Sequence, residues 1–281
     1  MELWLVLAIL SYFSYSISTS MDKYFMNEGY DTAGTTTLKM FFDGIILLMF
    51  GLLFFDLTFT FESLLGASVI GILYALSAII YFTSLKLKDV DIIMPYFQSF
   101  AILLIFISST VLFNEFVNLY NCVGVALILI GVYVVLSKNG FKVPTLDKGI
   151  FLISVVVILN TVYSLAVKKL LFDIEPITLA IMMYFSATII LSCYMFLSGK
   201  QKKLLDTKKH KIILSSFFAA TGVFLLYSAL SVGNASKVYS VGGLESVFIF
   251  IFASLFLKEK FHWHRLIGIF IVVAGIFLIS L

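Results

Sequence analysis

The sequence predicts an all-α integral membrane protein whose ten transmembrane helices form two inverted five-helix repeats. Two observations predict this fold class. The composition is 61% hydrophobic and only 12% charged, whereas soluble domains carry roughly 25% charged residues. In addition, a motif near the middle of the chain recurs near its end.

Ten apolar stretches are long enough to cross a bilayer, which requires about 20 mostly apolar residues. They cover residues 3–22, 32–54, 63–85, 90–113, 117–136, 149–171, 176–197, 211–232, 236–257 and 263–281. The longest hydrophilic connection, residues 199–211, has only thirteen residues. No soluble catalytic domain fits in such connections, so we expect no enzymatic activity and a functional site inside the bundle.

The repeated motif divides the chain into two halves of the same design. Its residues keep a constant offset of 144: Glu115, Gly124 and Gly131, then Glu259, Gly268 and Gly275. We therefore predict a first repeat over residues 1–140 and a second over residues 146–281, which together form one membrane unit.

The charge distribution indicates that the second repeat is inverted. Five helices per repeat is an odd number, so the second copy enters the membrane in the opposite direction. Of the 19 Lys and Arg residues, 15 lie in connections that follow odd-numbered helices. Positive charge marks the cytoplasmic side of a membrane protein. We therefore predict a multi-pass cell-membrane protein with both termini facing outward.

The motif also carries a family resemblance. Phe113-Asn114-Glu115 and Leu257-Lys258-Glu259 each precede a helix with a Gly-x6-Gly pair, and the ends of the third helices, 81–86 and 226–230, have related sequences. In these features the chain resembles the ten-helix drug/metabolite transporter superfamily with paired EamA-type repeats. The resemblance covers essentially the whole chain and implies transport of amines, amino acids, sugars, nucleotide sugars or other metabolites. That family usually keeps its termini in the cytoplasm with a basic connection after helix two, whereas residues 56–62 here contain no Lys or Arg; we interpret the orientation as reversed.

Helix breaks at corresponding positions of inverted repeats mark a binding site near the membrane midplane. The fourth predicted helix contains Pro95, and the ninth contains Gly242 and Gly243. Proline removes a backbone hydrogen bond and glycine weakens a helix interior, so both positions could expose backbone polar groups to a cavity. The alternative is that Pro95 caps an early turn and that the glycines permit close helix packing.

Charged residues inside the predicted helices are functional candidates, because a charge at the bilayer centre costs roughly 2.5 to 3.5 kcal/mol. Lys39 and Asp43 have i, i+4 spacing and could form an ion pair on one helix face. Asp22 ends a polar stripe that is expected to face the bundle interior: Ser11, Ser14, Ser18 and Asp22.

Glu245 is the strongest candidate. It follows the two glycines and has no Lys or Arg within one helical turn. A desolvated carboxyl group there could exchange a proton near neutral pH, or balance the charge of an amine. The alternative is a protonated or hydrated glutamate that only ties helices together.

Aromatic, hydroxyl and amide side chains from both repeats are expected to line the same site, because small-molecule sites combine apolar walls with a few convergent polar groups. The candidates are Tyr15, Ser77, Tyr81, Gln98, Asn160, Tyr163 and Tyr227. Each of them alone could equally tie helices together. Lys237 starts the ninth helix within a segment that faintly resembles a motif of nucleotide-sugar carriers, which would imply an anionic substrate.

The function predicted from these features is secondary active transport of a small metabolite by alternating access, with or without proton coupling. A lipid or lipid-linked sugar translocator, or a carrier of an anionic nucleotide-sugar-like substrate, is the alternative. The sequence contains no nucleotide-binding or catalytic motif. We expect a small-molecule substrate and membrane lipids as partners, no cofactor, metal or nucleic acid, and a monomer or homodimer.

Overall fold

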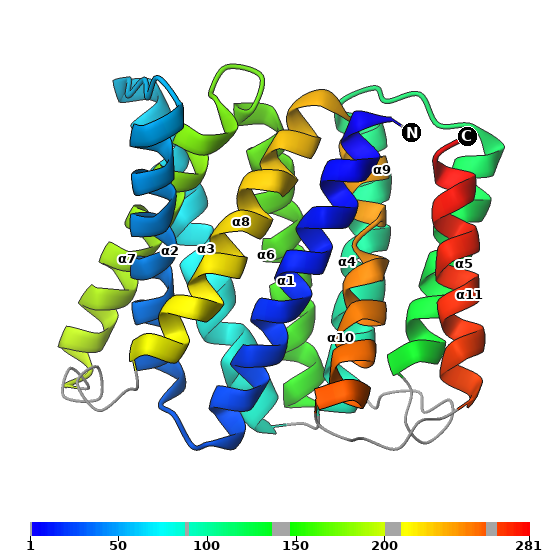
Figure 1. The fold of residues 1–281 in the computed structure, drawn as a ribbon, viewed down its shortest axis with the longest axis horizontal. Helices are drawn as coiled ribbons and strands as arrows, with labels where there is room; N and C mark the ends of the chain where they lie inside the picture. The colour runs from blue at the N-terminus through cyan, green and yellow to red at the C-terminus, as the bar shows by residue number, and fades with distance from the viewer. Residues whose placement is uncertain (1, 88–89, 137–146, 200–208, 257–262) are drawn as a thin grey trace.

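The computed structural model of the protein describes residues 2–87, 90–136, 147–199, 209–256 and 263–281, and every regular element in them is an α-helix (Figure 1). The helices are α1 (Leu3–Asn27), α2 (Thr32–Phe54), α3 (Phe61–Leu87), α4 (Val90–Leu112), α5 (Leu119–Leu136), α6 (Lys148–Leu170), α7 (Pro176–Leu197), α8 (Lys209–Val232), α9 (Ala235–Ser240), α10 (Gly243–Phe256) and α11 (Trp263–Ile279). These bounds agree closely with the predicted segments, except that α1 is longer and that α9 and α10 divide the ninth segment.

The packing of the helices follows the two repeats. α1 packs along α8, and α6, the counterpart of α1, packs along α3, the counterpart of α8. The counterparts α2 and α7 contact each other, and so do α5 and α11 at one side of the molecule (Figure 1). A two-fold axis in the membrane plane relates inverted repeats in this way. The predicted fold class is therefore confirmed.

Local sequence determines several helix ends. The Asp31 carboxylate accepts a hydrogen bond from the Gly34 N–H at 3.0 Å and caps α2, and Asp147 caps α6 through the Ile150 N–H at 3.0 Å. Pro176 occupies the start of α7, where its missing N–H would have had no helical partner. These ends allow the short connections that position the two repeats.

The ninth predicted segment is interrupted. Gly242 lies in a tight turn between α9 and α10, in which its N–H donates to the Tyr239 carbonyl oxygen at 3.0 Å. A Cβ atom on Gly242 would lie 2.8 Å from that oxygen and 3.1 Å from the Tyr12 ring. A larger residue would therefore not fit this turn without a shift of its neighbours.

The first repeat has no such interruption. α4 is continuous through Pro95, so the break expected at this position is absent. Pro95 is the sixth residue of α4, and a proline so near the start of a helix removes only one bond of the hydrogen-bond ladder. The two repeats are therefore asymmetric where a substrate site is expected.

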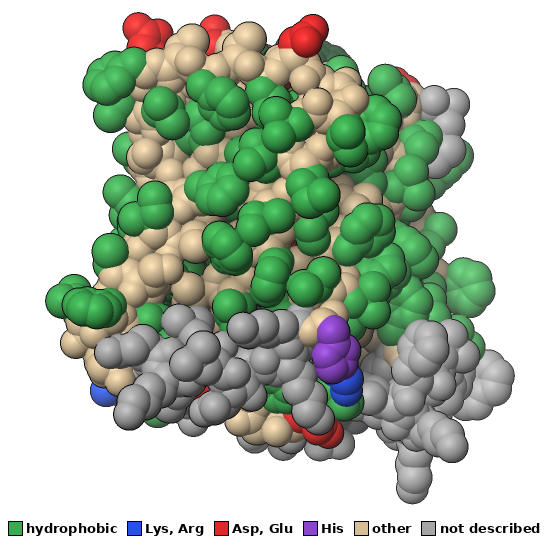
Figure 2. Space-filling view, turned by 60° about the vertical axis from the view of Figure 1, so that its left-hand side comes forward, with side chains coloured by type: hydrophobic (Ala, Val, Ile, Leu, Met, Phe, Trp, Pro, Cys, Tyr) green, Lys and Arg blue, Asp and Glu red, His purple; other side chains and the backbone are tan. Residues whose placement is uncertain are grey.

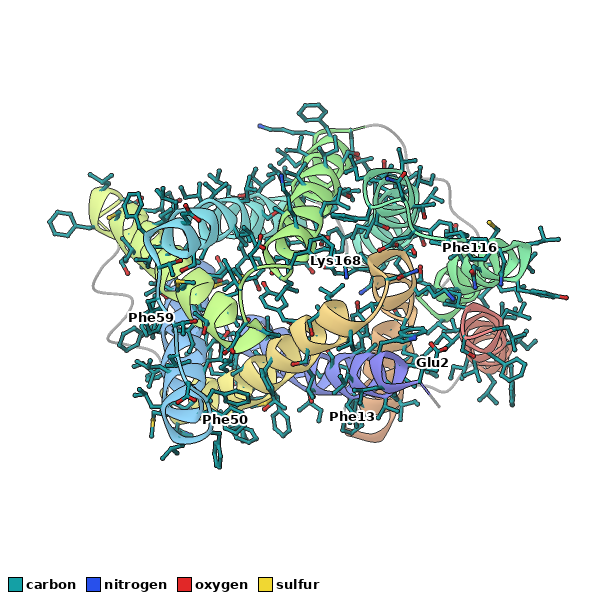
Figure 3. The ribbon with its side chains drawn as sticks, turned by 90° about the horizontal axis from the view of Figure 1, so that it is seen from above. Glu2, Phe13, Phe50, Phe59, Phe116 and Lys168 are labelled. Atoms are coloured by element: carbon teal, nitrogen blue, oxygen red, sulfur yellow. The ribbon has the colours of Figure 1, made fainter. Side chains whose placement is uncertain are left out.

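The outer surface matches a membrane environment. Figure 2 shows hydrophobic side chains spread over the face between two ends, with acidic groups at both ends and Lys and His at one of them. Phe13 and Phe50 are 40% and 39% exposed and lie at the outside of the bundle (Figure 3). Within the described residues, seven helical spans are long and apolar enough to cross a membrane by length and composition, and three shorter apolar helices lie in α4, α5 and α11. The protein is thus a multi-pass membrane protein.

The repeated glycines pack α5 against α11. A Cβ atom on Gly124 would lie 2.6 Å from the Gly275 carbonyl oxygen, and one on Gly131 would lie 2.8 Å from the Gly268 carbonyl oxygen. Small residues let membrane helices approach closely. The signature that relates the two repeats therefore serves a structural contact.

Candidate functional site

An ion pair joins α1 to α2. Lys39 Nζ binds the Asp22 carboxylate, and both side chains keep some exposed surface. The expected pair between Lys39 and Asp43 is not formed, although the charges of these two residues interact over a longer distance. The Lys39 side chain extends from α2 toward Asp22 on α1. Asp43, four residues after Lys39 on α2, instead lies near side chains of α3, α7 and α8.

Asp43 is deeply buried, with 2% of its surface exposed. Its Oδ1 atom has no hydrogen-bond partner among the described residues. The Ser216 hydroxyl group of α8 interacts with the carboxyl group and also donates to the Lys39 carbonyl oxygen at 3.2 Å. Tyr74 of α3 and Tyr184 of α7 lie within electrostatic range of the same carboxyl group.

Glu245 lies in the first turn of α10, directly after the interruption. Its Oε1 atom accepts a hydrogen bond from the Thr19 hydroxyl group of α1 at 2.9 Å, and Gln98 of α4 is a second hydrogen-bond partner. The charge of Lys39 also reaches this carboxyl group. Glu245 therefore connects helices of both repeats.

Tyrosines fill the interior next to these charges. The hydroxyl groups of Tyr163 on α6 and Tyr227 on α8 are hydrogen-bonded to each other at 2.7 Å, and both lie within hydrogen-bond distance of the Met183 sulfur, at 3.3 and 3.1 Å. The Tyr74 ring centroid is 5.3 Å from that of Tyr163 and 6.1 Å from that of Tyr184. These contacts join α3, α6, α7 and α8 into one aromatic group.

Several side chains near the charges are not fully buried. Tyr15 packs its ring against Gly222 of α8, where a Cβ atom would be 3.1 Å away, and Tyr81 lies 5.8 Å from the ring centroid of Phe97 on α4. Six residues from four helices are only half-buried: Tyr15, Thr19, Lys39, Tyr74, Tyr81 and Glu245. Such surface on inward residues is typical of a site that a small molecule can reach.

The remaining expected residues do not share these contacts. Ser77 is buried on α3, and its hydroxyl group lacks a hydrogen-bond partner in the described structure. Asn160 is half-buried on α6 and Lys237 is half-buried on α9, and none of the contacts given above involves either residue. The polar stripe of α1 does face inward, since Ser11 and Ser18 bind Gly222 and Ser215 of α8.

A second polar group lies where α8 passes into α9. The carboxylate of Glu115, in the connection between α4 and α5, accepts hydrogen bonds from the N–H groups of Ala235 (2.6 Å) and Ser236 (2.9 Å). Asn234, the residue that precedes α9, makes no side-chain cap of its own. The family signature of the first repeat therefore caps the broken helix of the second. Glu259, its counterpart, lies outside the described residues.

Lys168 completes this second group. Its ammonium group donates to the carbonyl oxygens of Leu230 (2.6 Å) and Gly233 (2.9 Å), and the charge of Glu115 attracts it. The side chain is 7% exposed and points into the bundle rather than away from it (Figure 3). Lys168 lies in the last turn of α6, and its partners come from the end of α8 and the residue after it.

Sequence reasoning missed Thr19, Tyr74 and Met183 as neighbours of the expected residues. Thr19 could have been identified from the sequence, because it lies one turn before Asp22 on the polar side of α1. Tyr74 and Met183 are ordinary apolar or aromatic residues of a membrane helix, and nothing in their local sequence distinguishes them.

The fold and this interior define a class: a multi-pass membrane protein of two inverted helical repeats, with charged and tyrosine side chains gathered at a broken helix. Within that class the chain belongs to the EamA-like transporter family, which matches residues 2–137 and 147–281. The resemblance to the drug/metabolite transporter superfamily is thereby confirmed.

Two further comparisons found similar proteins. An uncharacterized transporter of Archaeoglobus fulgidus is 24% identical over 201 residues, which are 72% of this chain and 70% of the relative. A solved crystal structure superposes with a TM-score of 0.75 and covers 98% of each chain at 14% identity. The second likeness concerns the fold alone.

Proposed function

We propose that the protein is a secondary active transporter that moves a small metabolite across the cytoplasmic membrane by alternating access, with proton exchange at Glu245. An amine, an amino acid or a similar solute is the expected substrate. Membership of a transporter family supports the general function and gives no reason to expect an enzyme. The position of Glu245 supports the more specific proposal that this residue exchanges a proton during transport.

Glu245 links the moving parts that alternating access requires. It begins α10 after the turn at Gly242, and it is bound by Thr19 of α1 and Gln98 of α4. Inverted-repeat transporters rock one group of helices against the other around a central site. A shift of α10 against α1 would change the hydrogen bonds of this carboxyl group, and with them its tendency to hold a proton.

The polar and charged groups that interact with Glu245 come from α1, α2, α3 and α4. They are Thr19, Gln98 and Lys39, together with four tyrosines within electrostatic range: Tyr12, Tyr15, Tyr74 and Tyr81. Only Lys39 among them carries a positive charge, and its ammonium group is bound to Asp22. The only positive charge among these groups is therefore already paired with another carboxylate, which leaves Glu245 available to bind a proton.

Transport by reconstituted protein tests the proposal. Liposomes that contain a trapped pH-sensitive dye are exposed to amines, amino acids, sugar nucleotides and anionic lipids at pH 6 and pH 8. We expect a soluble metabolite to drive a proton flux that differs between the two pH values. Glu245→Gln should abolish this flux, and Glu62→Gln, at an exposed position in the first turn of α3, should preserve it. Unchanged uptake and pH dependence in Glu245→Gln would exclude coupling through this residue.

The same assay separates the alternatives. Lipid translocation would be revealed by movement of anionic lipids without a metabolite flux. The exposed phenylalanines lie at the outside of the bundle, so they do not add support for a lipid-lined interior. Transport of a sugar nucleotide that is lost in Lys237→Gln would instead support the anionic substrate.

A further inference from the structure

Three carboxyl groups inside the bundle face one ammonium group. Asp22 lies on α1, Asp43 on α2 and Glu245 on α10, and the charge of Lys39 reaches all three. Lys39 is bound to Asp22, which neutralises that carboxylate. Lys211, near the start of α8, donates to the Tyr24 hydroxyl group instead. Two carboxyl groups are therefore left without a matched cation among the described side chains.

Asp43 shows the imbalance most clearly. It is 2% exposed, and its Oδ1 atom lacks a hydrogen-bond partner in the described structure. Buried polar groups are normally hydrogen-bonded, and a buried charge requires a counter-charge. A ligand that supplies positive charge and hydrogen-bond donors would satisfy both requirements.

Aromatic rings surround the same region. Tyr74 lies within electrostatic range of both Asp43 and Glu245. Tyr15 and Tyr81 lie near Glu245 and are half-buried, as is Tyr74. Aromatic faces attract organic cations, most strongly when water is excluded.

The geometry points to an organic cation as the substrate, an amine or quaternary ammonium compound with an apolar or aromatic body, held between Asp43 and Glu245 beside Tyr74. This inference rests on the proposed function and narrows its substrate to one charge class. An anion would meet two carboxyl groups and an ammonium group that is already paired. A metal ion is disfavoured because no three His, Cys, Asp or Glu side chains lie together in the described part of the chain.

Binding to the purified full-length protein tests the charge class. Three cations serve as probes: 2-phenylethylamine, benzyltrimethylammonium and choline. 2-Phenylethanol and phenylacetate serve as the neutral and the anionic analogue of 2-phenylethylamine. We expect saturable binding of at least one cation by calorimetry and a raised melting temperature, since a ligand that binds only the folded state stabilises it. The neutral and anionic matches should bind at least about tenfold more weakly, as expected for loss of a charge interaction. No saturable binding by any of the three cations overturns the inference.

Matched variants locate the site. Asp43→Asn should weaken cation binding at least about tenfold, whereas Asp173→Asn, at an exposed position between α6 and α7, should leave it unchanged. If Asp43→Asn does not fold, Asp43→Glu, which keeps the charge, and Glu245→Gln replace it: the first should bind and the second should bind weakly. Unchanged cation affinity in both Asp43→Asn and Glu245→Gln would place the cation elsewhere and overturn the assignment.

Uptake distinguishes failure of this inference from failure of the proposed function. Transport of neutral or anionic metabolites that the cations do not inhibit leaves a transporter but rejects the cation site. Cation binding that depends on Asp43, without uptake of any solute by liposomes, supports the site and rejects the transport function.

Discussion

Lys39 had two possible partners, and the choice between them shows what decides a contact at the level of single residues. Asp43 is close in sequence, but Asp22 of the neighbouring helix forms the ion pair. The i, i+4 rule describes isolated helices. Inside a bundle, the rotation of each helix determines which side chains meet.

A double-mutant cycle should show this preference. Lys39→Gln and Asp22→Asn should each lower the free energy of unfolding by about 1 to 3 kcal/mol, because each leaves a partly buried charge unpaired. The double variant should lose less than the sum, with a coupling energy of about 0.5 kcal/mol or more. The corresponding cycle with Asp43→Asn should give a smaller coupling. Unfolding in detergent provides the measurement, and equal coupling in both cycles would contradict the pairing.

Among the individual helices, α9 depends most on residues outside itself. It has only six residues, and short helices are marginal without external contacts. The Glu115 carboxylate satisfies two of its first N–H groups, and Lys168 binds the carbonyl groups that precede it. Opposite charges at the two sides of this turn match the partial charges of the helix ends.

Glu115→Gln should therefore destabilise α9. An amide cannot accept two charge-assisted hydrogen bonds through both of its terminal atoms, so we expect a loss of about 1 to 3 kcal/mol. Glu175→Gln is the matched control, because Glu175 precedes α7 without making a side-chain cap. Hydrogen exchange at Ser236 and the melting temperature report the effect. Equal behaviour of the two variants would mean that Glu115 does not cap α9.

The close contact between α5 and α11 predicts that a larger residue at Gly131 destabilises the protein. Gly131→Val should force the two helices apart, because even a Cβ atom would lie 2.8 Å from the Gly268 carbonyl oxygen. We expect a loss of about 1 to 3 kcal/mol or more in unfolding free energy, as for other overpacked sites. Ala126→Val on the exposed side of α5 should have little effect. A melting temperature unchanged by Gly131→Val would show that the helices can separate without cost.

For the whole molecule, charge indicates how the bundle lies in the membrane. Acidic groups lie at both ends of the face shown in Figure 2, whereas Lys and His lie at one end only. Both chain termini lie at one end of the bundle, and α8, whose first residues include Lys209 and Lys211, begins at the opposite end (Figure 1). By the positive-inside rule both termini are expected outside the cytoplasm.

A topology reporter tests this orientation. An enzyme that is active only outside the cytoplasm should be active when fused after Leu281, and a fluorescent protein that folds only in the cytoplasm should be dark there. The reverse pair of results would show that the usual orientation of the family holds. Fusions within residues 200–208, after α7, serve as the control and should give the opposite signals.

Much of the fold could be predicted because it depends on local properties of the chain. Apolar length identifies the spans, the odd number of helices per repeat requires inversion, and Gly242 marks where the ninth span is interrupted. Pro95 was misleading, since a proline near the start of a helix does not end it. In the candidate site, Glu245 and Gln98 could be selected because they are polar residues in apolar helices, but the contact between them could not be predicted.

The sequence by itself determined the spans, the inverted repeats and the family signature, because hydrophobicity, periodicity and repetition are written along the chain. Only the tertiary structure decided which side chains meet. Lys39 binds Asp22 rather than Asp43, Glu115 caps a helix 120 residues away, and Thr19 reaches Glu245 across 226 residues. Such contacts depend on how each helix is rotated and packed against the others, and packing is a property of the whole bundle rather than of any one segment.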